Sequence, residues 1–119
     1  MSKEIDRCEI FCSDKEKVEK VKTKLDGLEV MVDTFKALGD QTRFKIVYAL
    51  WYEELCVCDL SLALDLPIAA VSYHLRYLRS LRLVKNRKQG KMVFYSLNDD
   101  HIASLIQLTL DHTREINHK

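Results

Sequence analysis

The sequence predicts a mainly α-helical fold with a small β-hairpin wing, a winged helix-turn-helix that acts as a dimer. Two short apolar-patterned segments, 55–67 and 68–81, meet at Pro67, which is typical of two helices joined by a tight turn. Directly after them the apolar pattern changes to period two on both sides of Gly90, which predicts a β-hairpin. A basic hairpin that follows a helix-turn-helix indicates a wing.

Composition indicates a small single-core protein and argues against a membrane-spanning or secreted one. The chain has 119 residues, 47% of them hydrophobic, enough for one modest core. Its longest apolar run, 46–52, is far shorter than the ~18 residues of a membrane-spanning helix. The N-terminus lacks the pattern of a signal peptide, so we expect a cytoplasmic protein with no membrane partner. We expect an N-terminal arm and helix over 1–27 and a winged helix-turn-helix domain over 28–119.

Apolar residues at helical spacing predict three helices before the helix-turn-helix. The first covers the charged segment 14–27, the second covers 28–39, and each ends at a glycine. Asp40 is placed to cap the third, 41–52. That helix carries an apolar stripe that we expect in the core: Phe44, Val47, Tyr48 and Trp51.

The segment 68–81 is the predicted recognition helix. Val71, Leu75 and Leu78 share one face, which we expect to point inward. The first residues of such a helix lie nearest the base edges in the major groove. The candidates for DNA contact on this helix are Ser72, Tyr73, Arg76 and Arg79. His74 lies beside the apolar stripe, and both a buried hydrogen-bonding role and a DNA contact stay open for it.

The net charge of +1 conceals a strong asymmetry. Residues 66–98 contain no Asp or Glu and seven Lys or Arg, so the rest of the chain carries 1 − 7 = −6. Such a block is typical of a surface that binds a polyanion, although a solvated basic face is the ordinary alternative. On the wing, Arg87, Lys88 and Lys91 suit phosphate or minor-groove contacts. One recognition helix covers few bases, so we expect a homodimer on operator DNA with an inverted repeat.

The four cysteines lie in two close pairs: Cys8 with Cys12, and Cys56 with Cys58. In a reducing compartment such pairs more often bind metal or undergo redox chemistry than form structural disulfides. Thiolates favour Zn(II) and still softer ions such as Cd(II) and Pb(II). Side chains two apart diverge on a regular helix, so Cys56 and Cys58 share one ion only if the helix start is irregular. The alternative is that they are small buried apolar residues.

A second set of candidate ligands lies on the predicted C-terminal helix, which begins at Asp99 or Asp100. The set is Asp99, His101, His112 and Glu115. His101 and His112 are about 16 Å apart along a helix, so one ion cannot reach both within a chain. An antiparallel copy of the helix would bring the two halves together in two equal sites. The alternative is a capping Asp with solvated His and Glu.

These motifs, in this order and spacing, resemble the ArsR/SmtB family of metal-sensing repressors over nearly the whole chain. The matching stretches are ELCVCDL, VSYHLRYLR, RKQGKMVFYSL and the spaced DxH and HxxE, and CEIFC resembles the CadC-like branch, which responds to cadmium, lead and zinc. The resemblance implies a homodimer that represses a metal-efflux gene and leaves its operator when Cd(II), Pb(II) or Zn(II) binds. It also implies a soft-metal site of Cys8 and Cys12 from one subunit with Cys56 and Cys58 from the other. Tyr73 departs from the His or Gln of many relatives.

The resemblance further implies a Zn(II) site on the C-terminal helix, where all four matching residues are present. Residues 1–27 are thus expected to be a metal-binding arm and helix, and 28–119 the DNA-binding and dimerisation domain. A thiol-based redox regulator of the same fold is the alternative function. The sequence contains no phosphate-binding loop, nucleophile–base motif or dinucleotide fingerprint, so we expect no enzyme and no organic substrate.

Overall fold

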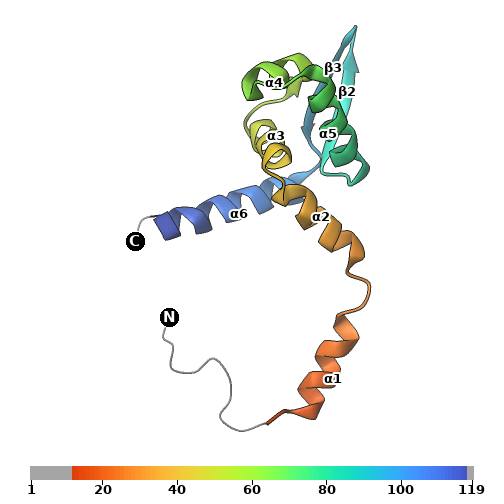
Figure 1. Cartoon of the computed structure of the whole chain (residues 1–119), viewed down its shortest axis with the longest axis vertical. Helices are drawn as coiled ribbons and strands as arrows, with labels where there is room; N and C mark the ends of the chain where they lie inside the picture. Colours follow the sequence, from red (N-terminus) through yellow and green to blue (C-terminus); the bar gives the residue numbers. More distant parts are fainter. Residues whose placement is uncertain (1–11, 118–119) are drawn as a thin grey trace. The chain divides into compact units, whose positions relative to one another are not determined.

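The computed structural model describes residues 12–117, and the chain divides between Met31 and Val32 into two units. Helix α1 (Lys15–Lys24) lies in the first unit, and α2 (Glu29–Gly39) crosses the division. The second unit continues with α3 (Gln41–Tyr52), β1 (Leu55–Cys56), α4 (Val57–Leu64), α5 (Ile68–Ser80), β2 (Val84–Gln89), β3 (Met92–Leu97) and α6 (Asp100–Asn117) (Figure 1). The domain boundary expected after residue 27 stays a prediction. No helix within residues 12–117 is long and apolar enough to cross a membrane.

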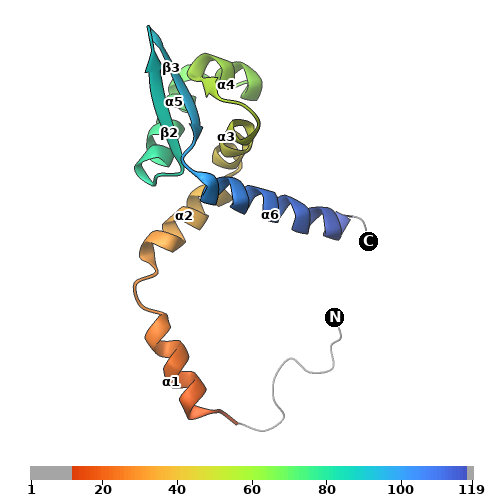
Figure 2. The ribbon, with the colours of Figure 1, turned by 180° about the vertical axis from the view of Figure 1, so that it is seen from behind.

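The three strands form one antiparallel sheet in the order β1-β3-β2. Strands β2 and β3 are the expected hairpin, which extends beyond the helices in Figure 2. Gly90 forms its turn at φ 64°, a backbone conformation that favours glycine in a two-residue hairpin loop. The sequence did not predict β1, because a strand of two residues has no measurable alternation.

Helices α4 and α5 form the predicted helix-turn-helix. Helix α4 ends at Asp65, which takes the left-handed conformation at φ 57° and ψ 50°. The Leu66 N–H then donates to the Ser61 carbonyl at 3.0 Å, and Pro67 leads into α5. On α5, Val71, Leu75 and Leu78 have no exposed surface, which confirms the inward face.

Helix α3 begins as expected but is less buried than expected. The Asp40 carboxylate accepts a hydrogen bond from the Arg43 N–H at 3.0 Å, so Asp40 caps the helix. Of the predicted stripe only Val47 is fully buried. Phe44, Tyr48 and Trp51 are half-buried and pack against the edge of the core, with Tyr48 in ring contact with both of the others.

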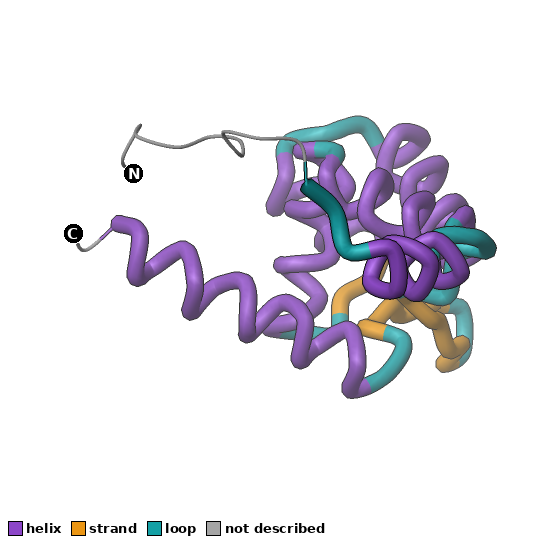
Figure 3. Tube along the Cα trace, turned by 90° about the horizontal axis from the view of Figure 1, so that it is seen from below, coloured by secondary structure: helices purple, strands orange, loops and turns teal. Residues whose placement is uncertain are grey.

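Helix α6 is anchored to the second unit at its start. Ile106 is buried, and Ile102 and Leu105 pack against the core. The C-terminal half runs away from the other elements of this unit as a single helix (Figure 3). Leu108 at mid-helix is 67% exposed and Ile116 near the end is 56% exposed, so α6 leaves apolar surface uncovered in the described chain.

Candidate DNA-contacting surface and metal ligands

The outer face of α5 is exposed in the described part of the chain. Tyr73 is 59% exposed, and Arg76 and Arg79 are exposed, while Ser72 is half-buried. The helix therefore presents an aromatic ring and two guanidinium groups opposite its buried stripe. These are side chains that stack on, or donate hydrogen bonds to, nucleic acid.

His74 lies at the edge of that face and contacts other protein groups. Its Nδ1 is 3.5 Å from Nη1 of Arg43, and its ring makes an edge contact with Tyr73. The Arg43 guanidinium also stacks on the Tyr77 ring, 4.5 Å from its centroid, so Arg43 connects the start of α3 to α5. These contacts favour the hydrogen-bonding role for the half-buried His74. A DNA contact by His74 stays a prediction.

On the wing, Lys88 and Lys91 are exposed and form no ion pair within the described residues. Arg87 differs from both. Its Nε and Nη2 donate to the two carboxylate oxygens of Glu54, both at 2.8 Å, and its Nη1 donates to Gln89 at 2.7 Å. Its guanidinium also lies over the Phe94 ring, 5.0 Å from the centroid.

The partner of Arg87 was missed by sequence reasoning. The hydrogen bond from Arg87 lowers the pKa of the Glu54 carboxyl below its ordinary value, and the same bond raises the pKa of Arg87. Glu54 is 33 residues away in sequence and lies outside the acid-free block. Only recognition of β1, which places Glu54 beside the hairpin, could have revealed it.

The thiols at the start of the helix-turn-helix lie in different environments. We expected both on the first helix of the motif, and this is wrong for Cys56, which ends β1 and precedes the first residue of α4. Cys56 is 6% exposed, whereas Cys58 lies within α4 and is exposed. The strand-to-helix junction between them is the irregular helix start that a shared ion requires.

The other two predicted thiol ligands lie toward the N-terminus. Cys12 is exposed and precedes α1, and Cys8 lies outside the described residues. Within residues 12–117 of a single chain, no three His, Cys, Asp or Glu side chains come together in a group that could hold a metal. A metal site built from the described ligands alone therefore needs a second chain or a rearrangement of this one.

The candidate ligands at the start of α6 lie close together. The Asp99 carboxylate accepts from the backbone N–H groups of His101 at 3.0 Å and Ile102 at 3.3 Å, so Asp99 caps the helix. Hydrogen bonding from the Asn98 side chain is the main cause of a lowered Asp99 pKa. The Nδ1 atom of His101 is 3.5 Å from the Asp99 carboxylate, and the His101 side chain is 93% exposed.

The other half of this ligand set is distant along the same helix. His112 and Glu115 are exposed near the C-terminal end of α6. The helix is continuous from Asp100 to Asn117, so the separation of about 16 Å between His101 and His112 applies. A single chain brings Asp99 and His101 together and leaves His112 and Glu115 apart from them.

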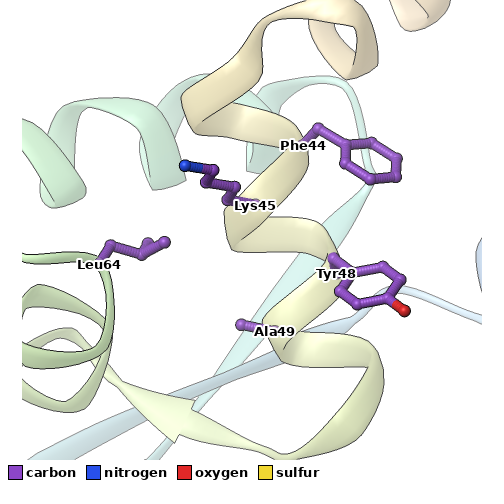
Figure 4. Close-up of a pocket in the computed structure, with 5 residues that line it drawn as sticks. All are labelled: Phe44, Lys45, Tyr48, Ala49 and Leu64. Carbon is purple, nitrogen blue, oxygen red and sulfur yellow. The ribbon is translucent and has the colours of Figure 1, made fainter.

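A shallow pocket of about 290 Å³ between α3 and α4 lies apart from these ligands. Figure 4 shows Phe44 and Tyr48 along α3, with Leu64 of α4 facing that helix. Lys45 and Ala49 complete the lining, which contains no thiolate, imidazole or carboxylate. The pocket therefore offers no ligands for a metal ion.

The sequence is similar to those of known bacterial regulatory proteins. Residues 40–86 match the family model of bacterial regulatory proteins of the arsR family. The chain is 42% identical, over 93% of its length and 94% of the relative's, to a cadmium resistance transcriptional regulatory protein CadC homolog of Staphylococcus aureus.

Solved structures agree on the fold. HlyU from Vibrio cholerae matches with a TM-score of 0.66 and 34% identity, over 71% of this chain and 92% of that one. A homodimeric winged helix-turn-helix DNA-binding domain from Mycobacterium bovis matches with a TM-score of 0.67 at 24% identity, over 91% of this chain and 95% of that one. Helices α4 and α5 with the β2–β3 hairpin are thus a winged helix-turn-helix.

Proposed function

The chain belongs to the ArsR/SmtB family of transcriptional regulators, a non-enzymatic family, and from this premise we propose a repressor released from DNA by soft metal ions. It binds operator DNA as a homodimer and dissociates when Cd(II), Pb(II) or Zn(II) binds, and it controls metal-efflux genes. One observation carries the proposal. The pair Cys56 and Cys58 lies at the start of the same helix-turn-helix whose second helix exposes Arg76 and Arg79.

The DNA half of the proposal rests on exposure and charge. Tyr73, Arg76 and Arg79 are on the outer face of α5, and Lys88 and Lys91 on the wing form no ion pair with any residue of 12–117. In a dimer, two such faces would bind the two halves of an inverted repeat. The homodimeric assembly of the M. bovis domain and the uncovered apolar surface of α6 support this assembly here.

The soft-metal site uses thiolates from two subunits. Cys56 and Cys58 of one protomer would bind the ion together with Cys8 and Cys12 from the arm of the other. Three observations support it: the exposure of Cys58 and Cys12, the irregular chain between Cys56 and Cys58, and the name of the S. aureus relative as a cadmium resistance regulator. Thiolate ligands prefer these ions over Mg(II) or Ca(II).

Operator binding at fixed salt, with and without each metal, tests the function. Cd(II) is expected to weaken binding in the presence of a strong reductant and to produce ultraviolet thiolate-to-metal absorption in the free protein. Metal-independent operator binding, with release only on thiol oxidation, would instead support the redox regulator. Binding to no DNA at any salt concentration would contradict both.

The second metal site is a Zn(II) site made by α6 of both subunits. Asp99 and His101 of one protomer would meet His112 and Glu115 of the other. The closeness of the first pair and the distance to the second support a bridging arrangement. Carboxylate and imidazole ligands suit zinc.

Mixed dimers test this bridging, with the thiols replaced by Ser in every protein. Asp99→Ala/His101→Ala protein and His112→Ala/Glu115→Ala protein should each fail to hold zinc on α6. The verified heterodimer of the two should regain one site, because one chain keeps each half of the ligand set. A heterodimer that binds no zinc while the Ser parent binds it would exclude bridging, and full zinc binding by both variants would refute the ligand assignment.

A further inference from the structure

The three strands place the thiol segment in direct register with the wing. Cys56 of β1 pairs with Phe94 of β3, and Phe94 pairs with Arg87 of β2. Residues directly opposite one another in antiparallel strands present their side chains on the same face of the sheet. Cys56, Phe94 and Arg87 therefore form one row across the sheet, from the predicted metal ligand to the wing.

Glu54 connects the two ends of this row. It lies two residues before Cys56, and its carboxylate holds Arg87 through two hydrogen bonds of 2.8 Å. Arg87 is further held by Gln89 and by the Phe94 ring. Two parallel N–H···O bonds fix both the distance and the orientation of a guanidinium, so a displacement of Glu54 moves Arg87 with it.

We propose that the Glu54–Arg87 ion pair transmits metal binding at Cys56 and Cys58 to the DNA-contacting wing. Glu54 is in this sense a positioning residue for Arg87. The inference rests on the proposed function, since it describes how the thiolate site regulates DNA binding.

The need for movement follows from the exposure of the two sulfurs. Cys58 is exposed and Cys56 is 6% exposed, so the two thiolates can share one ion only if the chain or a side chain at this junction shifts. The Cys56 N–H donates to Asp59 of α4 at 3.3 Å, and β1 consists of two residues. Because Glu54 directly precedes this two-residue strand, a shift of Cys56 would be passed to Glu54 and, through the ion pair, to Arg87 on the wing.

Glu54→Gln and Arg87→Lys are the test substitutions. Gln keeps the size of the side chain without its charge, and Lys keeps the charge of Arg87 without its planar fork. Glu53→Gln is the matched control, because Glu53 is the neighbouring acid and forms no ion pair in the described part of the chain. It corrects for the general gain in DNA affinity when one negative charge is removed.

The measured quantity is the factor by which Cd(II) weakens operator binding, which for allosteric coupling is typically about 5–150. Glu54→Gln and Arg87→Lys should each lower this factor by about 2–5-fold, the range expected for an exposed ion pair. The free variants should bind Cd(II) with wild-type stoichiometry and thiolate absorption. Glu53→Gln should keep the wild-type factor. The Glu54→Gln/Arg87→Lys double variant should lower the coupling factor no further than either single variant, because the two residues act as one unit.

A second measurement needs no DNA. The Arg87 Nε–H NMR signal, identified by its absence in Arg87→Lys, should shift when Cd(II) binds the wild-type dimer and shift much less in Glu54→Gln. A wild-type coupling factor in Glu54→Gln, or an Arg87 signal that Cd(II) leaves unchanged, would overturn the proposal while the repressor function stands. If wild-type protein binds Cd(II) without any loss of operator affinity, the proposed function fails and the coupling fails with it.

Discussion

Replacing Lys91 by Ala should remove one positive charge that neutralises a DNA phosphate from each wing of the dimer. Lys91 lies in the hairpin turn, is exposed, and forms no ion pair within the described residues, so its charge is available to DNA. The slope of log K against log salt concentration changes by ~0.9 for each phosphate that is no longer neutralised, and two per dimer give ~1.8. The loss of affinity should therefore be about 12-fold greater at 50 mM than at 200 mM salt.

Fluorescence anisotropy of a labelled operator, measured across this salt range, checks the prediction. Lys88→Ala should behave like Lys91→Ala, because neither lysine forms an ion pair in the described part of the chain. Arg87→Ala should flatten the slope less, since Glu54 occupies one edge of its guanidinium. Lys36→Ala, an exposed lysine on α2, is the control and should leave the slope unchanged. An unchanged slope and affinity in all three wing variants would refute a DNA contact by the wing.

Three further outcomes follow from particular side chains. Leu75→Ala should lower the free energy of unfolding by about 2–5 kcal/mol in chemical denaturation, because Leu75 is fully buried. The control Leu62→Ala should change it by less than ~0.5 kcal/mol, because Leu62 is 83% exposed. Asp40→Ala should lower the free energy of unfolding by about 0.5–2 kcal/mol at neutral pH, because it removes the cap of α3. The hydrogen bond from the Arg43 N–H lowers the Asp40 pKa. The stability that Asp40 contributes should therefore be complete above its ordinary pKa of ~3.9 and disappear as pH falls through its lowered pKa in the folded protein. An equal loss of stability in Asp40→Ala at pH 2 and pH 7 would contradict this. Cys58→Ser should leave stability and metal-free operator binding nearly unchanged, because Cys58 is exposed. The same substitution should abolish release from the operator by Cd(II). Release at the wild-type Cd(II) concentration would exclude this sulfur as an inducer ligand.

Local patterns were sufficient for most of the secondary structure. The inward face of α5 followed from the spacing of Val71, Leu75 and Leu78, because a buried helix face repeats every three to four residues. The cap at Asp40 and the turn at Gly90 followed from local chemistry, since a carboxylate satisfies free N–H groups and glycine accepts positive φ. Each of these signals lies within a few neighbouring residues, so the sequence alone determined it.

Tertiary structure decided what depends on pairing between distant segments. The strand β1 exists because Leu55 and Cys56 pair with β3, and two residues carry no periodicity of their own. That pairing places Cys56 in a buried position, leaves Cys58 exposed, and brings Glu54 to Arg87 across 33 residues. The sequence identified the thiols and the basic wing separately. Only the fold places Cys56 and Arg87 of the wing in one row of the sheet, because contacts between strands are set by register and not by distance along the chain.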